Sequence, residues 1–278
     1  MAHTDKLHII PFYNLEQYLD LSSLIPLGLT NKYLLQEVYT KTQPFPIVIT
    51  EPESGIILSK FKNVELEINE ADQFKDENLK LMSKAVFLKL EEADTITDDG
   101  IQNLVNLKGL HLNNYNFITD IGLRNLTNLV ELDLYATEKI TDSALVNLKN
   151  LTSLDLGFNK VITDAGLVEL RKLRILSLLN CYSITDKGII PLTNLLILNL
   201  ENNNKITGNG LISLTNLVGL DLNRNPNITD NDIIPLTKLE LLNLEENELI
   251  SSYSVDNLPK LISTSFEFWD FANQLSEF

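Results

Sequence analysis

A fixed period of 22 residues runs through most of the sequence and limits the folds that it can adopt. The tripeptide Ile-Thr-Asp returns with this spacing at residues 96, 118, 140, 162, 184, 206 and 228, and Gly208 replaces Asp in the copy at 206. A constant period of about 20 to 50 residues is typical of solenoids, whose units stack because one unit cannot bury its own apolar face. The period therefore predicts an elongated solenoid of about nine stacked units.

Each repeat contains two patterns of apolar residues. Leucines with one residue between them, such as Leu154 and Leu156, are typical of a short strand with one buried face. Leu123, Leu126 and Leu129 are spaced by three residues, which suits a helical or 3₁₀ turn. One repeat is therefore expected to hold one strand and one short helical return.

Three segments follow the pattern LxxLxLxxN, the first of them with Cys181 in the Asn position. They are LRILSLLNC (173–181), LLILNLENN (195–203) and LVGLDLNRN (217–225). The repeats therefore resemble those of the leucine-rich repeat family over about residues 64–269, and the adjoining I-T-D-x-G-L is similar to the cysteine-containing subfamily found behind F-boxes. The resemblance implies an α/β solenoid, a leucine-rich repeat horseshoe with a parallel inner sheet of about ten strands and short α or 3₁₀ outer segments.

Three columns of the repeat are interpreted as structural. The Asp of the tripeptide is a favoured N-cap residue and is expected to cap the return helix. Two residues later, small residues such as Gly122 and Ala144 are expected to let neighbouring returns pack closely. Cys181 stands where Asn159 and Asn203 stand in other repeats. A buried cysteine is usually an inert apolar group, so packing is expected for Cys181.

The loss of the period at both ends divides the chain into four expected parts. They are a small helical F-box-like or capping module at 1–45, a linker with a possible capping strand at 46–63, the repeats at 64–260, and a C-terminal capping strand and tail at 261–278. A last strand near residues 264–266 would keep the register of the repeats. The aromatic residues expected to close the last repeat are Phe266, Phe268, Trp269 and Phe271.

The N-terminal segment YLDLSSLIPLGLTNKYL (18–34) resembles the second half of an F-box, with Leu19, Leu21 and Leu24 at matching positions. The resemblance implies that this module docks on the small adaptor subunit of a cullin-RING ubiquitin ligase, and that these three leucines contribute to the docking. The same segment also fits a plain helical cap over the first repeat, which a solenoid needs. Both alternatives stay open, and one module could serve both purposes.

Composition argues against several functions. The formal net charge of −16 disfavours nucleic acids and anionic membranes as partners. The single cysteine suits a reducing compartment, and no signal peptide or transmembrane run is recognised, so an intracellular location is expected. The sequence shows no phosphate-binding loop, zinc-type cluster or His/carboxylate pairing, so no enzyme activity, cofactor or metal is expected.

Side chains that flank the strand leucines are expected to face the concave surface, and many of them are acidic. The expected partner-binding residues there are Tyr135, Phe158, Leu179, Asp133, Asp155, Asp221 and His111. Apolar anchors within a charged rim are typical of a binding hot spot. The sequence therefore predicts a basic protein partner, anchored on Tyr135 and Phe158 and oriented by the three aspartates.

Two hypotheses for the function follow. The first is a non-catalytic interaction scaffold that acts as an F-box-type, substrate-recruiting adaptor of a cullin-RING ubiquitin ligase. The alternative is a plain leucine-rich repeat binding or structural module, such as an effector or a virus-encoded interaction protein, whose N-terminus only caps the solenoid. A secreted or surface adhesin of internalin type is disfavoured, because no export signal is recognised.

Overall fold

The computed structural model describes residues 45–49, 52, 64–68, 71–90, 95–265, 268, 269 and 272. Apart from its last residue, the helical module expected at 1–45 lies outside this part of the chain, and so do Leu19, Leu21 and Leu24. Phe266 and Phe271, expected in the C-terminal cap, also lie outside the described residues.

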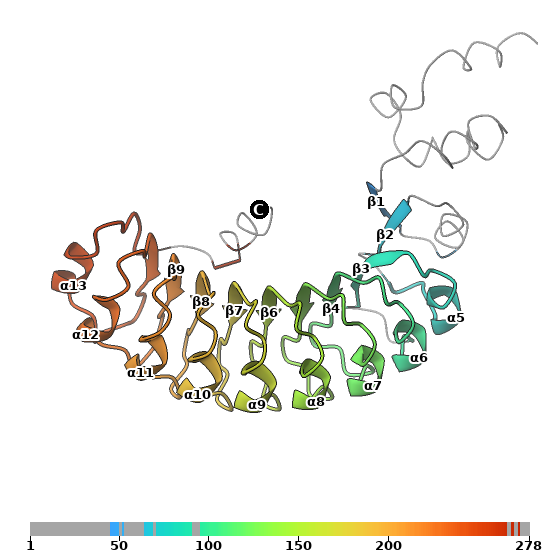
Figure 1. Ribbon diagram of the computed structural model, residues 1–278, viewed down its shortest axis with the longest axis horizontal. Coiled ribbons are helices and arrows are strands. Elements are labelled where there is room, and N and C mark those ends of the chain that lie inside the picture. Colours follow the sequence, from blue (N-terminus) through green and yellow to red (C-terminus); the bar gives the residue numbers. More distant parts are fainter. Residues whose placement is uncertain are drawn as a thin grey trace, which may run out of the picture.

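Within the described residues the sheet contains ten parallel strands, and their order in space is their order in the chain. The strands are β1 (Phe45–Val48), β2 (Val64–Ile68), β3 (Ala85–Lys89), β4 (Gly109–His111), β5 (Glu131–Asp133), β6 (Ser153–Asp155), β7 (Ile175–Ser177), β8 (Ile197–Asn199), β9 (Gly219–Asp221) and β10 (Leu241–Asn243). In Figure 1 they line the concave side of a curved solenoid. The expected horseshoe with an inner parallel sheet is confirmed.

Short helices line the convex side of the solenoid (Figure 1). They are α5 (Asp76–Leu79), α6 (Asp98–Ile101), α7 (Asp120–Leu123), α8 (Asp142–Leu145), α9 (Asp164–Leu167), α10 (Asp186–Ile189), α11 (Gly208–Leu211), α12 (Asp230–Ile233) and α13 (Ser252–Asp256). One strand and one helical return per repeat is therefore the arrangement that the two leucine patterns predict.

Equivalent leucines of successive strands lie opposite each other. Leu132 is paired with Leu110 on one side and with Leu154 on the other, and Leu154 and Leu156 are fully buried. The strand leucines join those of the helical returns in one continuous core. Since truncation of such a buried leucine to alanine costs about 2 to 5 kcal/mol, much of the repetition serves stability.

The sheet starts before the repeats were expected to start. Strand β1 pairs with β2 from Phe45↔Val64 to Val48↔Glu67, and it begins one residue before the segment in which a capping strand was expected. Its pairing covers the edge of β2, whose backbone groups would otherwise lack partners in the sheet. Between β2 and β3 the register shifts at Leu66/Glu67.

The threonine of the Ile-Thr-Asp tripeptide is the N-cap residue of helices α6 to α12. Thr119 has an extended backbone and its hydroxyl accepts a hydrogen bond from the N–H of Ile121, while Asp120 is the first residue inside α7. The expectation that the aspartate is the N-cap is therefore wrong. Both residue types favour this position, and the extended backbone at threonine decides which of them holds it.

The aspartates instead join neighbouring repeats. Asp98 accepts hydrogen bonds from the N–H (2.8 Å) and the hydroxyl (2.6 Å) of Thr119 in the next repeat. The same two bonds join Asp76 to Thr97, Asp120 to Thr141, Asp142 to Thr163, Asp164 to Thr185, Asp186 to Thr207 and Asp230 to Ser251. Hydrogen bonds to charged groups are stronger than those between neutral groups, so this ladder stabilises the convex side.

The glycine column leaves room for these aspartates. The N–H of Gly122 donates to Asp98 Oδ1 at 3.0 Å, and a Cβ atom at Gly122 would lie 2.5 Å from the same oxygen. A Cβ atom at Gly188 would lie 2.7 Å from Oδ1 of Asp164. The small residues therefore allow the carboxylate of the preceding repeat to approach the next helix, which gives the expected close packing its physical cause.

The asparagine column forms a second ladder inside the solenoid. Asn203 donates to the carbonyl of Cys181 at 2.7 Å and accepts from the N–H groups of Lys205 and Ile206. Cys181 takes the equivalent position one repeat earlier, where its thiol donates to the carbonyl of Asn159 at 3.4 Å. Burial raises the pKa of Cys181 to about 11, so the thiol stays protonated and packs as expected.

After the last helix, the chain keeps the register without forming the expected strand. Ser263 makes an isolated parallel bridge with Leu241, 22 residues earlier, but Thr264 and Ser265 are not in a strand. The described part of this segment thus extends the sheet at one residue only.

Phe268 does not close the last repeat, so the expected C-terminal cap is wrong for this residue. Phe268 and Ala272 instead pack against Ile175 and Ile197, which lie on β7 and β8. In Figure 1 the coloured, described part of this segment lies over the concave side of the sheet. Two apolar side chains on that face offer Phe268 a surface on which its ring is removed from water.

Candidate functional site

Two columns of strand side chains face the concave surface, because side chains alternate along a strand and the middle leucines point into the core. The first residues of β4 to β10 form one column: Gly109, Glu131, Ser153, Ile175, Ile197, Gly219 and Leu241. The third residues form the other: His111, Asp133, Asp155, Ser177, Asn199, Asp221 and Asn243. Three of the predicted aspartates and His111 therefore lie in one column.

The aspartates of this column also shape the chain at the end of each strand. Asp133 Oδ1 accepts the N–H of Tyr135 at 2.8 Å, and Asp155 Oδ1 accepts the N–H of Gly157 at 2.8 Å. Such Asx turns stabilise a change of chain direction. Asp133 and Asp155 thus have a structural task in addition to any contact with a partner.

His111 and Glu131 form an ion pair on adjacent strands. His111 Nε2 lies 2.6 Å from Glu131 Oε1, and the ring of Phe87 meets the imidazole edge to face at 4.8 Å. Burial disfavours the charged imidazolium, but the hydrogen bond to Glu131 and the charges of Glu131 and Asp133 outweigh it and raise the pKa of His111. His111 therefore takes up a proton more readily than an exposed histidine.

Asp155 has a strongly raised pKa. Burial and the neighbouring charge of Asp133 raise its pKa from the ordinary 3.8 to about 7, although hydrogen bonds from Gly157 and Ser177 act in the opposite direction. Only 7% of the residue is exposed. At neutral pH the carboxyl group is consequently divided between its protonated and charged forms.

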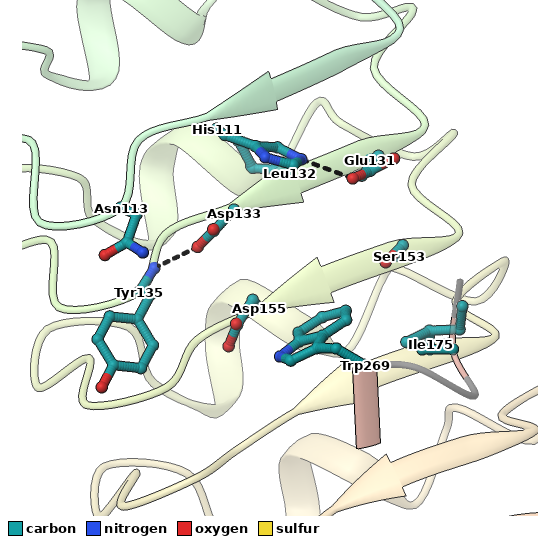
Figure 2. A pocket seen from close by; sticks show the side chains of 11 residues that line it. His111, Asn113, Glu131, Leu132, Asp133, Tyr135, Ser153, Asp155, Ile175 and Trp269 are labelled. Atoms are coloured by element: carbon teal, nitrogen blue, oxygen red, sulfur yellow. Dashed lines mark hydrogen bonds and ion pairs between the residues drawn. The ribbon is translucent and has the colours of Figure 1, made fainter. Parts of the chain in front are cut away.

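These residues surround a pocket of about 410 Å³ on the concave face. Its lining includes His111, Glu131, Asp133, Tyr135 and Asp155 from the sheet, and Trp269 from the C-terminal segment. In Figure 2 the Trp269 ring lies beside Asp155, and the His111–Glu131 pair lies on the other side of Asp133. The site therefore joins carboxylates of neighbouring strands to an indole ring that is remote in sequence.

The two predicted aromatic anchors contact each other at the ends of the strands. The ring centroids of Tyr135 and Phe158 lie 5.2 Å apart, and 42% of Phe158 is exposed. Phe158 has a φ of 57°, which is unusual for a bulky residue, and its N–H donates to the carbonyl of Leu179 at 2.8 Å. The backbone of the half-buried Leu179 thus lies beside that of Phe158.

Asp221 lies apart from the other predicted residues. It belongs to β9, three strands beyond the β6 strand of Asp155, and is 4% exposed. Its two carboxylate oxygens accept hydrogen bonds from the N–H of Asn223 (2.9 Å) and the amide of Asn243 (3.1 Å). The structure therefore brings Asp133, Asp155, Tyr135 and His111 into one pocket but leaves Asp221 outside it.

Sequence reasoning missed the apolar part of this face. Ile175 and Ile197 take positions that Glu131 and Ser153 hold in the two preceding repeats, and they are covered by Phe268. The sequence did indicate a covered apolar patch, because two successive repeats carry isoleucine at a position that should face the solvent. The aromatic run FEFWDF (266–271) was read as an end cap and not as a segment that returns to the sheet.

The site suits a cationic side chain. Carboxylates form charge-assisted hydrogen bonds with lysine and arginine, and the faces of tryptophan and tyrosine rings attract cations. No cluster of three or more His, Cys, Asp or Glu that could hold a metal occurs in the described ranges.

The parallel inner sheet, the helical returns and the asparagine ladder define a repeat solenoid with a concave face for contacts. The chain belongs to the leucine-rich repeat family. A family model described as "Leucine Rich repeats (2 copies)" matches residues 105–147, and one described as "Leucine Rich repeat" matches residues 147–170 and 192–215. Proteins of this family are typically non-enzymatic binding scaffolds. The matching models describe the repeats in general, so the cysteine-containing, F-box-associated subfamily stays a prediction.

Solved structures with similar repeats include internalins. Internalin C2 from Listeria monocytogenes is 31% identical over 69% of this chain and 84% of that chain, with a TM-score of 0.55. Internalin F from the same organism is 23% identical over 86% of this chain and 77% of that chain, also with a TM-score of 0.55, and shows a shared fold. Rad7 in its complex with yeast Elc1 is 17% identical over 89% of each chain, with a TM-score of 0.45, which carries no inference. No curated protein matched the sequence.

The helices that the structure describes are all too short or too polar to span a membrane.

Proposed function

We propose that this protein is a non-catalytic scaffold that seats a basic protein or peptide on its concave face, over strands β4 to β7. The observation that carries the proposal is the pocket in which Glu131, Asp133 and Asp155 meet the rings of Tyr135 and Trp269. A lysine or arginine side chain would find charge and aromatic surface there at once. The formal net charge of −16 would attract the same partner over a longer range.

The carboxylates of the pocket have different parts in this proposal. Glu131 and Asp133 supply charge at the mouth of the pocket, where His111 balances some of it through its ion pair with Glu131. Asp155 has a pKa of about 7 because it is buried and lies near Asp133. An entering cation would favour its charged form, so binding at neutral pH would release protons.

The aromatic pair supplies the anchor. The rings of Tyr135 and Phe158 contact each other in a tilted arrangement with their centroids 5.2 Å apart, and the exposed part of Phe158 is available for contact. Aromatic residues surrounded by polar groups dominate the energy of many interfaces. Asp221 would contact the same partner only if that partner extends three strands further, to β9.

A peptide selection against the immobilised full chain tests the proposal. We expect the selected peptides to be enriched in lysine and arginine. For one such peptide, Phe158→Ala should weaken binding by about 1 to 4 kcal/mol, the range of hot-spot truncations.

Phe117→Ala is the matched control for the anchor. Phe117 is 55% exposed and its ring contacts Tyr115 at 5.5 Å, so it resembles Phe158 in exposure and in its aromatic neighbour. The ring of Phe158 contacts Tyr135, which lines the pocket, whereas Tyr115, the neighbour of Phe117, does not line it. Equal losses in the two variants, or a selection without enrichment of basic residues, would contradict the proposal.

We also propose a finer role, as an F-box-type adaptor that recruits a substrate to a cullin-RING ubiquitin ligase. Its support is the match of Leu19, Leu21 and Leu24 to the F-box pattern, followed in the chain by leucine-rich repeats. These leucines lie outside the described residues. In this role, residues 1–45 would bind the adaptor subunit, and the concave face would hold the substrate in the cytoplasm or another intracellular compartment.

Co-expression with the small adaptor subunit tests the adaptor role. We expect a complex with the full chain that is lost in the Leu19→Ala/Leu21→Ala/Leu24→Ala variant, while Phe158→Ala leaves it intact. If no complex forms, or if deletion of residues 1–45 does not abolish it, the N-terminal module is only a cap and the protein is a plain binding module.

A further inference from the structure

We infer that the apolar patch of β7 and β8 is a second part of the binding surface, now occupied by the chain's own C-terminal segment. It would accept a partner helix with an aromatic residue, a small residue four positions later, and flanking basic residues. This inference rests on the proposed function and names the partner's chemistry in more detail. The tail residues are defined here as Phe268, Trp269 and Ala272.

The floor of the patch consists of two isoleucines on adjacent strands. Ile175 and Ile197 are paired in the β7–β8 register, and with the tail in place they are 5% and 0% exposed. The neighbouring strands carry Ser153 and Gly219 at the same position. Since serine and glycine have small side chains, the two isoleucines form a bounded apolar strip on a face that is otherwise mostly polar.

The tail residues show which chemistry fits this strip. Phe268 is 5% exposed and Ala272 is fully buried, and both pack on the isoleucines, with Leu196 at the side. The three tail residues have helical backbone, in which positions four residues apart lie on the same face. An aromatic ring and a small side chain one helical turn apart are therefore the pattern that the strip accepts.

The same segment also forms a wall of the acidic pocket. Trp269 meets Phe268 edge to face at 5.0 Å and lines the pocket together with Glu131, Asp133 and Asp155. The apolar strip and the acidic pocket are thus adjacent, and one helix can reach both. A partner that displaces this segment would contact both surfaces, with Tyr135 and the carboxylates left in place and its own aromatic residue in the position of the displaced rings.

The charge of the C-terminal segment does not complement this face. Residues 264–278 contain three acidic residues and no lysine or arginine, while the sheet beneath carries the pocket carboxylates. A helix with the same apolar pattern and with basic residues would add charge attraction to this acidic face. The described tail residues contact the strip through apolar side chains. Because the tail belongs to the same chain as the strip, it is held there mainly by its high effective concentration.

Trp269 allows a direct test, because it is the only tryptophan in the protein. The full chain is titrated with a synthetic peptide of residues 264–278 that carries Trp269→Phe and therefore contributes no tryptophan fluorescence. A second peptide carries Asp270→Lys and Glu277→Lys in addition. We expect both to displace the tail and to shift the emission of Trp269 to longer wavelength, the basic peptide at a concentration at least about tenfold lower.

Two controls fix the location of the effect. The peptide with Phe268→Ala should require a concentration at least about tenfold higher, as for loss of an anchor. Ile197→Glu in the protein should release the tail and abolish the response to either peptide. The stack tolerates a carboxylate in this column, since Glu131 occupies it two repeats before Ile175, and Ile175→Glu provides a second variant with the same expected result.

Several results would overturn the inference. One is an emission wavelength of Trp269 that shifts in Ile197→Glu but stays constant when saturating peptide is added to the original protein. The strip would then accept no segment from another molecule. Another is equal displacement by the acidic and basic peptides. A dimer in light scattering that dissociates in Phe268→Asp would show that the occupant is the tail of a second copy. In each case, the loss of partner binding in Phe158→Ala would still test the proposed function separately.

Discussion

Asp232 of helix α12 occupies the space that a side chain at Gly208 of helix α11 would take. A Cβ atom at Gly208 would collide with Asp232 Oδ1. Asp232 Oδ2 accepts the N–H and the hydroxyl of Thr229, both at 2.8 Å. In the other repeats with this ladder, the preceding repeat supplies that acceptor. At this junction Gly208 stands where the other repeats have the ladder aspartate. Asp232, which stands where they have a small residue such as Gly210, provides the acceptor instead.

The exchange predicts strong coupling between these two positions. Gly208→Asp alone should destabilise the protein by about 1 to 3 kcal/mol, because the new carboxylate overlaps Asp232. Asp232→Gly alone should cost about 1 to 3 kcal/mol, because the N–H and hydroxyl of Thr229 lose their acceptor. The double variant should regain the ladder and lie within about 0.5 kcal/mol of the original protein. Chemical denaturation of the four proteins measures the coupling.

The reverse exchange serves as its control. Asp186 and Gly210 form the usual arrangement one junction earlier, where Asp186 accepts both hydrogen bonds of Thr207. Asp186→Gly with Gly210→Asp should reproduce the Gly208/Asp232 arrangement and be nearly neutral. Additive losses in both double variants would show that the two columns do not exchange this role.

Much of the fold could be predicted from the period alone. Because Leu110, Leu132 and Leu154 are 22 residues apart, their pairing in parallel strands follows from stacking identical units. The identity of the N-cap could not be predicted in this way, since Thr119 and Asp120 are both favoured residue types and only the backbone conformation separates them. The contact of Phe268 with Ile197 could not be predicted from the period either, because these two residues are not related by the repeat.

The buried Asp155 should make stability depend on pH. Its pKa in the folded protein, about 7, is above its ordinary value of 3.8, so the native state binds more protons than the unfolded state between these values. Stability therefore falls as the pH rises from about 4 to about 7. Asp155→Asn removes the titrating group and with it this decrease in the free energy of unfolding. The variant should therefore be more stable than the original protein at pH 8 by at most about 4 kcal/mol, with little difference below pH 4.

Asparagine is a suitable replacement because Asn199 holds the same column and accepts the N–H of Glu201 at 2.7 Å. Asp256→Asn, at an exposed position, controls for the substitution itself. Thermal unfolding across the pH range gives the comparison. A constant difference between Asp155→Asn and the original protein from pH 4 to pH 8 would contradict the assignment.

Ala136 offers a test of the strained turn after each strand. Its φ is 54°, and the equivalent positions include Asn114 and Asn180, residues that tolerate this conformation better than alanine. Ala136→Gly should raise the free energy of unfolding by about 0.5 to 1 kcal/mol. Ala165→Gly, at an exposed site in α9, should lower it by a similar amount. Destabilisation by both changes would show that the turn is not strained.

Partner binding should weaken as the pH falls from 8 to 6. In this range Asp155, with a pKa of about 7, takes up a proton. Protonation of His111 acts in the same direction, and the pKa of His111, raised through Glu131, favours its charged form. Both changes reduce the negative charge offered to a basic peptide. His111→Gln combined with Asp155→Asn should flatten the pH profile of the peptide affinity. A profile that keeps its slope in this variant would assign the effect to other groups.

The candidate site was only partly predictable. Tyr135 and Phe158 lie close together because the repeat places them at the ends of adjacent strands, and the sequence is sufficient for that. The pocket needs Trp269, whose position depends on the fold of the C-terminal segment. The raised pKa of Asp155 depends on its burial beside Asp133, and an acidic residue in a strand pattern carries no sign of either.

The salt dependence of peptide affinity, measured in matched charge variants, tests the central claim most directly. Glu131→Gln removes a charge from the concave pocket, and Glu169→Gln removes the same charge from an exposed position after α9. We expect a selected basic peptide to bind Glu131→Gln at least about fivefold more weakly at low salt, with a smaller difference at high salt. Glu169→Gln should match the original protein. Equal affinities of the two variants at both salt concentrations would contradict the claim that the concave face holds the partner.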